Sequence, residues 1–184
     1  GIIQIVTTNG LRFGVGEGDV LAFFADRLKV QQREAGVRHD LIDAVFALGR
    51  EDDLVRLLAR VHALQAFMGT EDGTNLLAGY KRAANILKKE SFEAGAVNPA
   101  PDAAEAALFG ALEVAEPQAQ AAVAAEDFAG AMAALASLRA PIDAFFEAVM
   151  VNDPDLVKRA ARLSLLARFF AAVHKVADFG KIEG

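Results

Sequence analysis

The stretch DVLAFFADRLKVQQREAGVRHD, residues 19–40, predicts a helix that is apolar on one side and basic on the other. Leu21, Phe24 and Leu28 recur at spacings of three and four residues, which places them on one helical face. Gly36 is expected to end this helix, because glycine readily adopts the left-handed conformation of a helix C-cap. Such a helix can bury one face in a core, while its cations either bind an anion such as RNA or are simply solvated. The cations of this stretch are Arg27, Lys29, Arg33 and Arg38.

Helical periodicity continues through the rest of the chain. A helix over 75–90 would contain Gly79, which costs roughly 1 kcal/mol against alanine and predicts close approach by a neighbouring helix or a ligand. Residues 70–73 are expected to form a turn, with Thr74 as the N-cap that follows, and residues 91–101 a connector. No segment after residue 18 alternates as a strand does, so the fold class is all-α, a helical bundle of about seven to nine helices. The expected helices are 19–35, 40–48, 52–68, 75–90, 103–114, 117–125, 127–138, one that begins at Pro141, and one of about 25 residues that ends at Asp178.

Length and composition agree with one domain, or one domain with an appendage. The 184 residues are 54% hydrophobic, which is enough for a substantial core. The absence of cysteine excludes disulfides and thiolate metal sites and fits a reducing, cytoplasmic environment. No run of about 18 apolar residues occurs, so no membrane partner is expected. Residues 1–18 are interpreted as a truncated lead-in from a longer protein, and 19–184 as a helical domain with an acidic, alanine-rich segment over 91–140.

The net charge of −6 is distributed unevenly along the chain. Residues 91–150 hold nine acidic side chains and one basic one, whereas residues 18–90 hold eleven of each sign. Because phosphate binding depends on local clusters of Lys and Arg, a negative total does not exclude a nucleic acid. Tyr80 precedes two cations and is a candidate to stack on an unpaired base. Besides the cations of 19–40, the basic clusters are Lys81, Arg82, Lys88 and Lys89, and Lys158, Arg159 and Arg162.

Motifs for catalysis by this chain are weak. Residues 14–18 alternate glycines as a dinucleotide loop does, but no strand directly precedes them and helices follow. His39 with Asp40 would suggest a metal phosphohydrolase, yet no histidine lies upstream, and helix capping by Asp40 is the simpler interpretation. The few serines lie outside any glycine elbow. We therefore expect no catalytic residue, no metal site and no cofactor in this chain.

Three segments carry a family resemblance that covers nearly the whole chain. They are FFADRLKVQQREAGVRHDLIDAVFA (23–47), EDGTNLLAGYKRAANILKKE (71–90) and PIDAFFEAVMVNDPDLVKRAARLSLLARF (141–169). In this order they resemble the C-terminal region of the bacterial glycyl-tRNA synthetase beta subunit. The third segment also resembles the helical anticodon-binding domain of the DALR type, which arginyl-tRNA synthetases share. The segment over 91–140 departs from the pattern, so no functional residue is carried onto it.

The resemblance implies a part in joining glycine to its tRNA. The parent enzyme is an α2β2 ligase that uses ATP and magnesium, with catalysis in the alpha subunit, while the beta subunit binds tRNA. This chain would then be a non-catalytic fragment of the ligase. Its partners would be glycine tRNA, the alpha subunit and the rest of the beta subunit. The beta subunit family also has an HD-type domain, whose motif is not the His39-Asp40 pair.

Two functions follow as hypotheses. In the first, the chain recognises the anticodon: its basic clusters contact phosphates and bases, Arg38 contributes from the loop after the first helix, and Tyr80 stacks on a base. In the second, the chain is an acidic helical scaffold that docks on another domain or subunit without touching RNA. Basic clusters that share one face would favour the first hypothesis. Clusters that scatter and pair with Asp or Glu would favour the second.

Overall fold

The computed structural model describes residues 17–49, 53–92 and 95–183 of the chain. These residues form α-helices and one short 3-10 helix, with no strand among them, which confirms the expected all-α class. Residues 1–16 of the expected lead-in lie outside the described residues, and the first described helix begins at Glu17. The helices are α2 (Glu17–Glu34), α3 (His39–Phe46), α4 (Leu54–Met68), α5 (Glu71–Leu87), α6 (Ala103–Ala124), α7 (Phe128–Ala136), α8 (Arg139–Ala148), α9 (Leu156–His174) and the 3-10 helix η1 (Phe179–Lys181).

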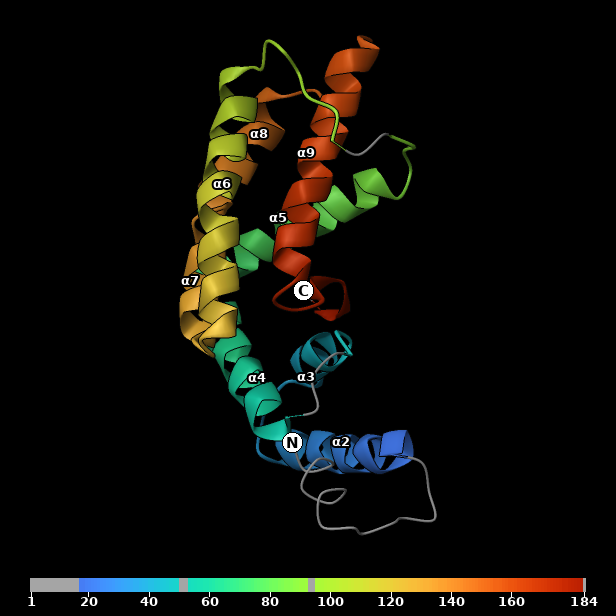
Figure 1. Ribbon diagram of the computed structural model, residues 1–184, viewed down its shortest axis with the longest axis vertical. Coiled ribbons are helices and arrows are strands. Elements are labelled where there is room, and N and C mark those ends of the chain that lie inside the picture. The colour runs from blue at the N-terminus through green and yellow to red at the C-terminus, as the bar shows by residue number, and fades with distance from the viewer. Residues whose placement is uncertain (1–16, 50–52, 93–94, 184) are drawn as a thin grey trace.

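The helices are arranged along one long axis of the molecule (Figure 1). α6 and α9 both run along this axis and contact each other, and α7 and α8 pack against α6. α5 crosses behind α9 and contacts both α9 and α8. Towards the other end, α4 packs against both α7 and α3. α2 lies across the base of the molecule and contacts α3. The two ends of the molecule are therefore built from different parts of the chain.

Side-chain caps determine where several helices begin. The carboxylate of Asp53 accepts hydrogen bonds from the amides of Val55 and Arg56 at 2.9 and 3.2 Å. Asp155 caps the start of α9 in the same manner. At the end of α2, Gly36 has a left-handed φ of +84°, which confirms that this glycine terminates the first amphipathic helix.

The expected turn over 70–73 is wrong, because α5 already begins at Glu71. Its N-cap is Thr70 rather than Thr74: the Thr70 hydroxyl oxygen accepts from the amide of Gly73 at 3.1 Å. Glycine at this position permits the tight connection from α4, since a Cβ on Gly73 would lie 2.2 Å from the carbonyl oxygen of Phe67. The local composition resembles a turn, but these residues form the first turn of a helix.

α6 is one continuous helix where two had been expected, over 103–114 and 117–125. Pro117 lies inside it, although proline removes an amide donor and usually kinks or ends a helix. Burial on both sides of the proline explains the continuity. Leu112 before it and Ala115 and Ala119 around it are buried, so α6 buries side chains on both sides of the proline.

α9 is shorter than expected and ends at His174 after 19 residues. At 1.5 Å per residue it is about 28 Å long. The chain then folds back onto α3, where the amide of Asp178 donates to the carbonyl oxygen of Ala44 at 2.9 Å. The Asp178 side chain caps η1 by accepting from the amide of Gly180. This return brings the C-terminal segment into the core.

The core contains large aromatic side chains from distant parts of the chain, and Tyr80 and Phe179 are among its fully buried members. The helices approach closely at Gly79, where a Cβ would lie 3.2 Å from Cγ2 of Ile142 on α8. That contact confirms the prediction that a neighbouring helix approaches at this glycine. None of the described helices combines the length and the apolar character that are needed to cross a membrane.

Candidate nucleic-acid interface

The cations of α2 are largely engaged with the protein itself. Lys29 Nζ lies 3.1 Å from one carboxylate oxygen of Asp43 on α3, and Arg33 lies 3.7 Å from the other. Arg27 lies over the ring of Phe23 on its own helix, with 5.5 Å between the guanidinium carbon and the ring centre. Such exposed ion pairs contribute only about 0–1 kcal/mol each, so they orient α2 on α3 without holding it strongly.

Arg38 joins the C-terminal segment to the start of α3. Its guanidinium donates to both carboxylate oxygens of Asp40 and also to the carbonyl oxygen of Glu183, the last at 2.7 Å. Asp40 is only 4% exposed. Burial raises the pKa of this carboxyl, but the hydrogen bonds from Arg38 and from the Glu183 amide outweigh it and leave the pKa below its usual value. Arg38 therefore has a structural role, although nearly half of its side chain faces solvent.

Tyr80 is a core residue in the structure, which argues against the predicted stacking on a base. Its side chain is 1% exposed. One ring face stacks on Phe170 at 4.6 Å between centroids, and Phe179 lies 5.6 Å away. The hydroxyl lies 3.4 Å from Nδ1 of His174. Burial and the nearby carboxylate of Asp178 raise the pKa of Tyr80, so it remains a neutral core residue.

Arg162 is also a core residue, and its burial argues against the predicted RNA contact at this position. It is 3% exposed and is held by three carboxylates. Nε lies 3.0 Å from Glu105, and the two terminal nitrogens lie 2.6 Å from Asp102 and Asp153. Burial raises the pKa of the Glu105 carboxyl, but the amide of Asp102 and the Arg162 guanidinium outweigh burial and lower it. This cluster ties α6, α9 and the loop before α9 together.

The second and third basic clusters meet where α5 ends and α9 begins. Arg159 forms an ion pair with Glu90 that joins the two helix ends. The hydrogen bond from Arg159 lowers the pKa of the Glu90 carboxyl. Lys88 and Lys89 are exposed beside Glu90 in the chain, and Lys158 is partly exposed beside Arg159. Arginine and lysine side chains from two helices are thus gathered at one junction.

The exposed face of α5 leads up to this junction. Arg82 and Asn85 on α5 and Lys89 just after its end follow one another at spacings of three and four residues, and all three are exposed. The Arg82 guanidinium carbon lies 4.3 Å from the ring centre of Phe146 on α8, which steadies the side chain. Lys81 is half-buried. Asn85 lies on the same exposed face, although it is not among the predicted site residues. We call Arg82, Lys88, Lys89, Lys158 and Arg159 the α5–α9 basic surface.

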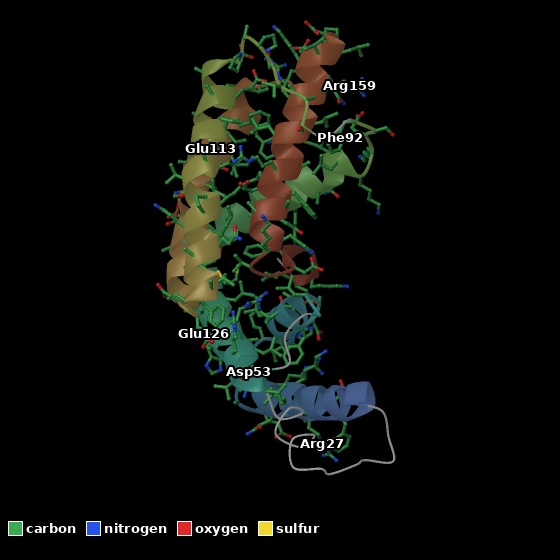
Figure 2. The ribbon with its side chains drawn as sticks, viewed as in Figure 1. Arg27, Asp53, Phe92, Glu113, Glu126 and Arg159 are labelled. Carbon is green, nitrogen blue, oxygen red and sulfur yellow. The ribbon has the colours of Figure 1, made fainter. Side chains whose placement is uncertain are left out.

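The three clusters do not form one shared face. Arg27 on α2 and Arg159 on α9 lie near opposite ends of the molecule (Figure 2). Two of the clusters meet at the α5–α9 basic surface, whereas the α2 cluster lies apart from it. The joint basic surface agrees with the RNA-binding hypothesis. The several cations that are paired with carboxylates agree with the scaffold hypothesis.

The acidic side chains of the described residues do not form a metal centre. Among them, no group of three or more Asp, Glu or His side chains is placed to hold a metal ion. His39 Nε2 instead lies 3.6 Å from the carboxylate of Glu183, beside the Arg38 contacts.

Comparison with known proteins assigns this helical arrangement to a class. The family model of the DALR anticodon binding domain matches residues 76–178, from within α5 to the turn after α9. The chain belongs to this family. The matched residues contain the whole α5–α9 basic surface and the Arg162 cluster, and they exclude α2, α3 and α4.

Several curated relatives carry the name glycine–tRNA ligase beta subunit. That of Rhodospirillum centenum is 50% identical over the whole of this chain, and the chain spans 29% of its length. That of Paracoccus denitrificans is 47% identical over the whole chain, which spans 30% of its length. That of Cereibacter sphaeroides is 53% identical over 91% of the chain. Both resemblances predicted from the sequence are confirmed, and the chain corresponds to less than a third of these relatives.

Proposed function

We propose that the chain binds tRNA and acts as the anticodon-recognising domain of a glycine–tRNA ligase beta subunit. The observation that best supports this function is the DALR match over residues 76–178, because those residues hold the α5–α9 basic surface. Cations supply most of the affinity for a nucleic acid by neutralising phosphates. Side chains with planar polar groups, such as Arg82 and Asn85, are suited to the edges or faces of unpaired bases.

The proposed contact is narrower than the set of predicted residues. We leave Tyr80 and Arg162 out of the proposed contact because both are buried, and half-buried Lys81 is a secondary candidate. The cations of α2 and the Arg38 loop lie outside the family match and towards the other end of the molecule. An RNA that touched them as well would have to extend along the molecule. We therefore assign the primary contact to the α5–α9 basic surface, and a secondary one to Arg27, Lys29, Arg33 and Arg38.

The names of the relatives support a wider proposal about the whole protein. The chain would be a non-catalytic part of a cytoplasmic ligase that joins glycine to its tRNA. An alpha subunit would carry out catalysis with ATP and magnesium, in an α2β2 assembly with the complete beta subunit. In that setting this chain positions the tRNA and does no chemistry of its own.

A gel-shift titration of the chain tests recognition of the anticodon. Three RNAs are compared: glycine tRNA, glycine tRNA with a changed anticodon, and an unrelated tRNA. We expect the tightest binding to unmodified glycine tRNA. Equal affinity for all three RNAs, or no binding at low salt, would refute anticodon recognition.

A pair of double variants tests the location of the contact. Lys88→Ala with Lys89→Ala removes two exposed cations of the basic surface, and Lys175→Ala with Lys181→Ala removes two exposed lysines elsewhere. If Lys88 and Lys89 neutralise phosphates, the log–log salt dependence of binding falls by about 1.5 in the first variant. The control variant should keep the original slope. Equal changes in both variants would move the contact away from the α5–α9 basic surface.

The scaffold hypothesis remains the second candidate, because specific contacts favour it. Lys29, Arg33, Arg38 and Arg162 are all paired with carboxylates, and residues 91–150 are strongly acidic. A domain that binds none of the three RNAs at low salt, while it binds a protein segment, would have this function. The two functions are also compatible, since the basic surface and the acidic α6 occupy different parts of the molecule.

A further inference from the structure

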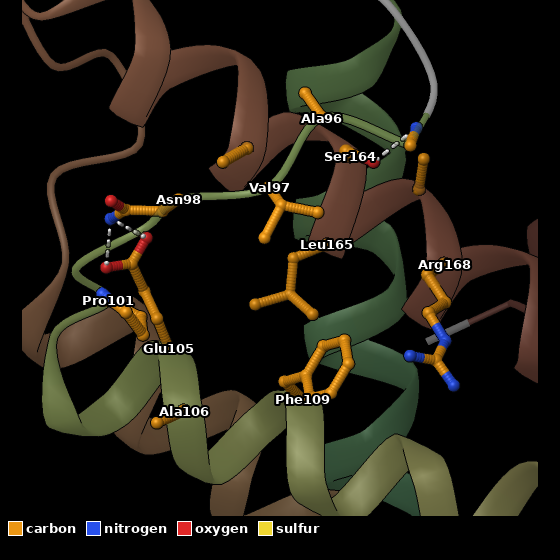
Figure 3. A pocket seen from close by; sticks show the side chains of 13 residues that line it. Ala96, Val97, Asn98, Pro101, Glu105, Ala106, Phe109, Ser164, Leu165 and Arg168 are labelled. Atoms are coloured by element: carbon orange, nitrogen blue, oxygen red, sulfur yellow. Dashed lines mark hydrogen bonds between the residues drawn. The ribbon is translucent and has the colours of Figure 1, made fainter.

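An apolar groove of about 740 Å³ lies between α6, α9 and the connector over 95–101 (Figure 3). Its volume is within the range of pockets that bind ligands, about 300–1,000 Å³. The side chains of Val97, Phe109 and Leu165 lie around the same space in the close-up view. Alanines of both helices, at positions 106 and 161, complete the apolar lining.

The polar groups around the groove are used to build it. The side-chain amide of Asn98 donates to Glu105 at 3.2 Å, which holds the connector on α6. Ser164 on α9 accepts from the amide of Gly95 at 2.8 Å. Because these groups already have partners within the protein, the groove offers an occupant mainly apolar contacts. A ligand that depends on hydrogen bonds, such as a base read by its edge, is poorly matched to it.

Two large apolar side chains of the groove face solvent. Val97 is 75% exposed and Phe109 is 50% exposed. Val157 on α9, 57% exposed, lies one turn before Ala161 and extends the same helical face beyond the groove. Contiguous exposed apolar surface in a water-soluble fold commonly marks a site where another chain segment binds.

Glu105 and Arg168 line the groove, and the ion-pair clusters to which they belong hold more carboxylates than arginines. Arg168 lies over the Phe109 ring at 5.1 Å and is paired with Glu113 and Glu116 of α6. At the connector end lies the Arg162 cluster with its three carboxylates. Two arginines thus face five carboxylates, of which Asp102 and Glu113 are exposed. This charge disfavours phosphates and favours an occupant with Lys or Arg on its flanks.

Resting on the proposed function, in which this chain is one part of a longer beta subunit, we propose that the groove docks an amphipathic helix from another part of that polypeptide. Its apolar side chains, at i, i+3 or i+4, and i+7, would contact Val97, Phe109 and Leu165. Its Lys and Arg side chains would face Asp102 and Glu113. The relatives support this source, because the chain spans only 25–30% of their length. Segments of one polypeptide meet at high effective concentration, so a groove of this size suffices.

Overlapping 18-residue peptides test the proposal. They cover the part of the Rhodospirillum centenum relative outside the matched region and are titrated with this chain by fluorescence anisotropy. The expected binder is an amphipathic peptide with net positive charge. Phe109→Ser should weaken its binding at least ten-fold, and Val97→Ser should weaken it several-fold. Both side chains are substantially exposed, so neither variant is expected to unfold the chain.

Val114→Ser is the matched control, since Val114 is also on α6, is 54% exposed and does not line the groove. Its affinity for the peptide should stay within two-fold of the original. The proposal is overturned if no peptide binds in a way that depends on Phe109. It is also overturned if Val114→Ser loses as much affinity for the peptide as Phe109→Ser. Acidic peptides that bind as tightly as basic ones would also overturn the proposal. Competition for the groove by an RNA hairpin would assign it to RNA instead of to a protein segment.

Discussion

Removal of the Arg162 charge tests the buried ionic cluster most directly. In Arg162→Met, Glu105 stays 3% exposed and loses a guanidinium donor at 3.0 Å. Removing one partner of a buried ion pair costs about 3–5 kcal/mol, because the remaining charge is left uncompensated. Asn98 and the amide of Asp102 still donate to Glu105, at 3.2 and 2.7 Å. We therefore expect the lower end of that range, a loss of about 3 kcal/mol in the free energy of unfolding.

Urea and thermal unfolding, followed by far-ultraviolet circular dichroism, measure this loss. The method suits a helical chain that has no tryptophan. For a chain of this size, a loss of about 3 kcal/mol lowers Tm by about 6–12 °C. A second substitution, Glu105→Gln in the Arg162→Met background, removes the uncompensated charge and keeps a side-chain oxygen for the Asp102 amide. It should recover a large part of the stability.

The pH dependence provides an independent check. The folded-state pKa of Glu105 is lowered in the original chain, so its stabilisation is present above the unfolded pKa of about 4.3 and is lost as pH falls through the folded pKa. The stability difference between the chain and Arg162→Met should therefore narrow as pH falls below about 5. A loss under about 1 kcal/mol at neutral pH, or a difference that does not narrow in acid, would refute the reasoning.

Three further substitutions have defined outcomes. Gly110→Ala should stabilise the chain by about 0.5–1 kcal/mol in urea unfolding, because a Cβ there meets nothing within 4 Å and alanine favours the helix. Destabilisation would contradict the open, helical surroundings of residue 110. Gly73→Ala should destabilise by about 1–3 kcal/mol in the same assay, since the Cβ would clash with the Phe67 carbonyl; an unchanged midpoint would be the opposing result. Arg38→Ala should cost about 1–3 kcal/mol by leaving Asp40 without its main donor. That loss of stability should shrink as pH falls below about 4, because the Asp40 carboxyl is protonated in the unfolded state before it is protonated in the folded state. Its tRNA affinity in the gel-shift assay should change little, and a large loss there would move the RNA contact towards α2.

Most helices of the fold were predictable from local patterns. Apolar residues at spacings of three and four predicted the helical class, and Gly36 correctly indicated the end of the first helix. The errors fall where neighbouring helices override local preference. Pro117 continues α6 because residues on both sides of it are buried, and Gly73 allows α5 to begin within an apparent turn. The contact of Gly73 with Phe67 is close in the sequence, whereas α6 also packs against α8 and α9, which follow much later in the chain.

By itself, the sequence determined the all-α class, the positions of the basic clusters and the family to which the chain belongs. Those properties depend on residue identity and short-range spacing. Only the tertiary structure decided which cations are open to a partner. Arg162 and Lys158 both lie in a basic cluster near the start of α9, yet Arg162 is enclosed by three carboxylates, two from the start of α6 and one from the loop before α9. Tyr80 likewise meets Phe170 and Phe179 about a hundred residues later in the chain. Burial of this kind arises when distant helices come together, so helical spacing alone does not predict it.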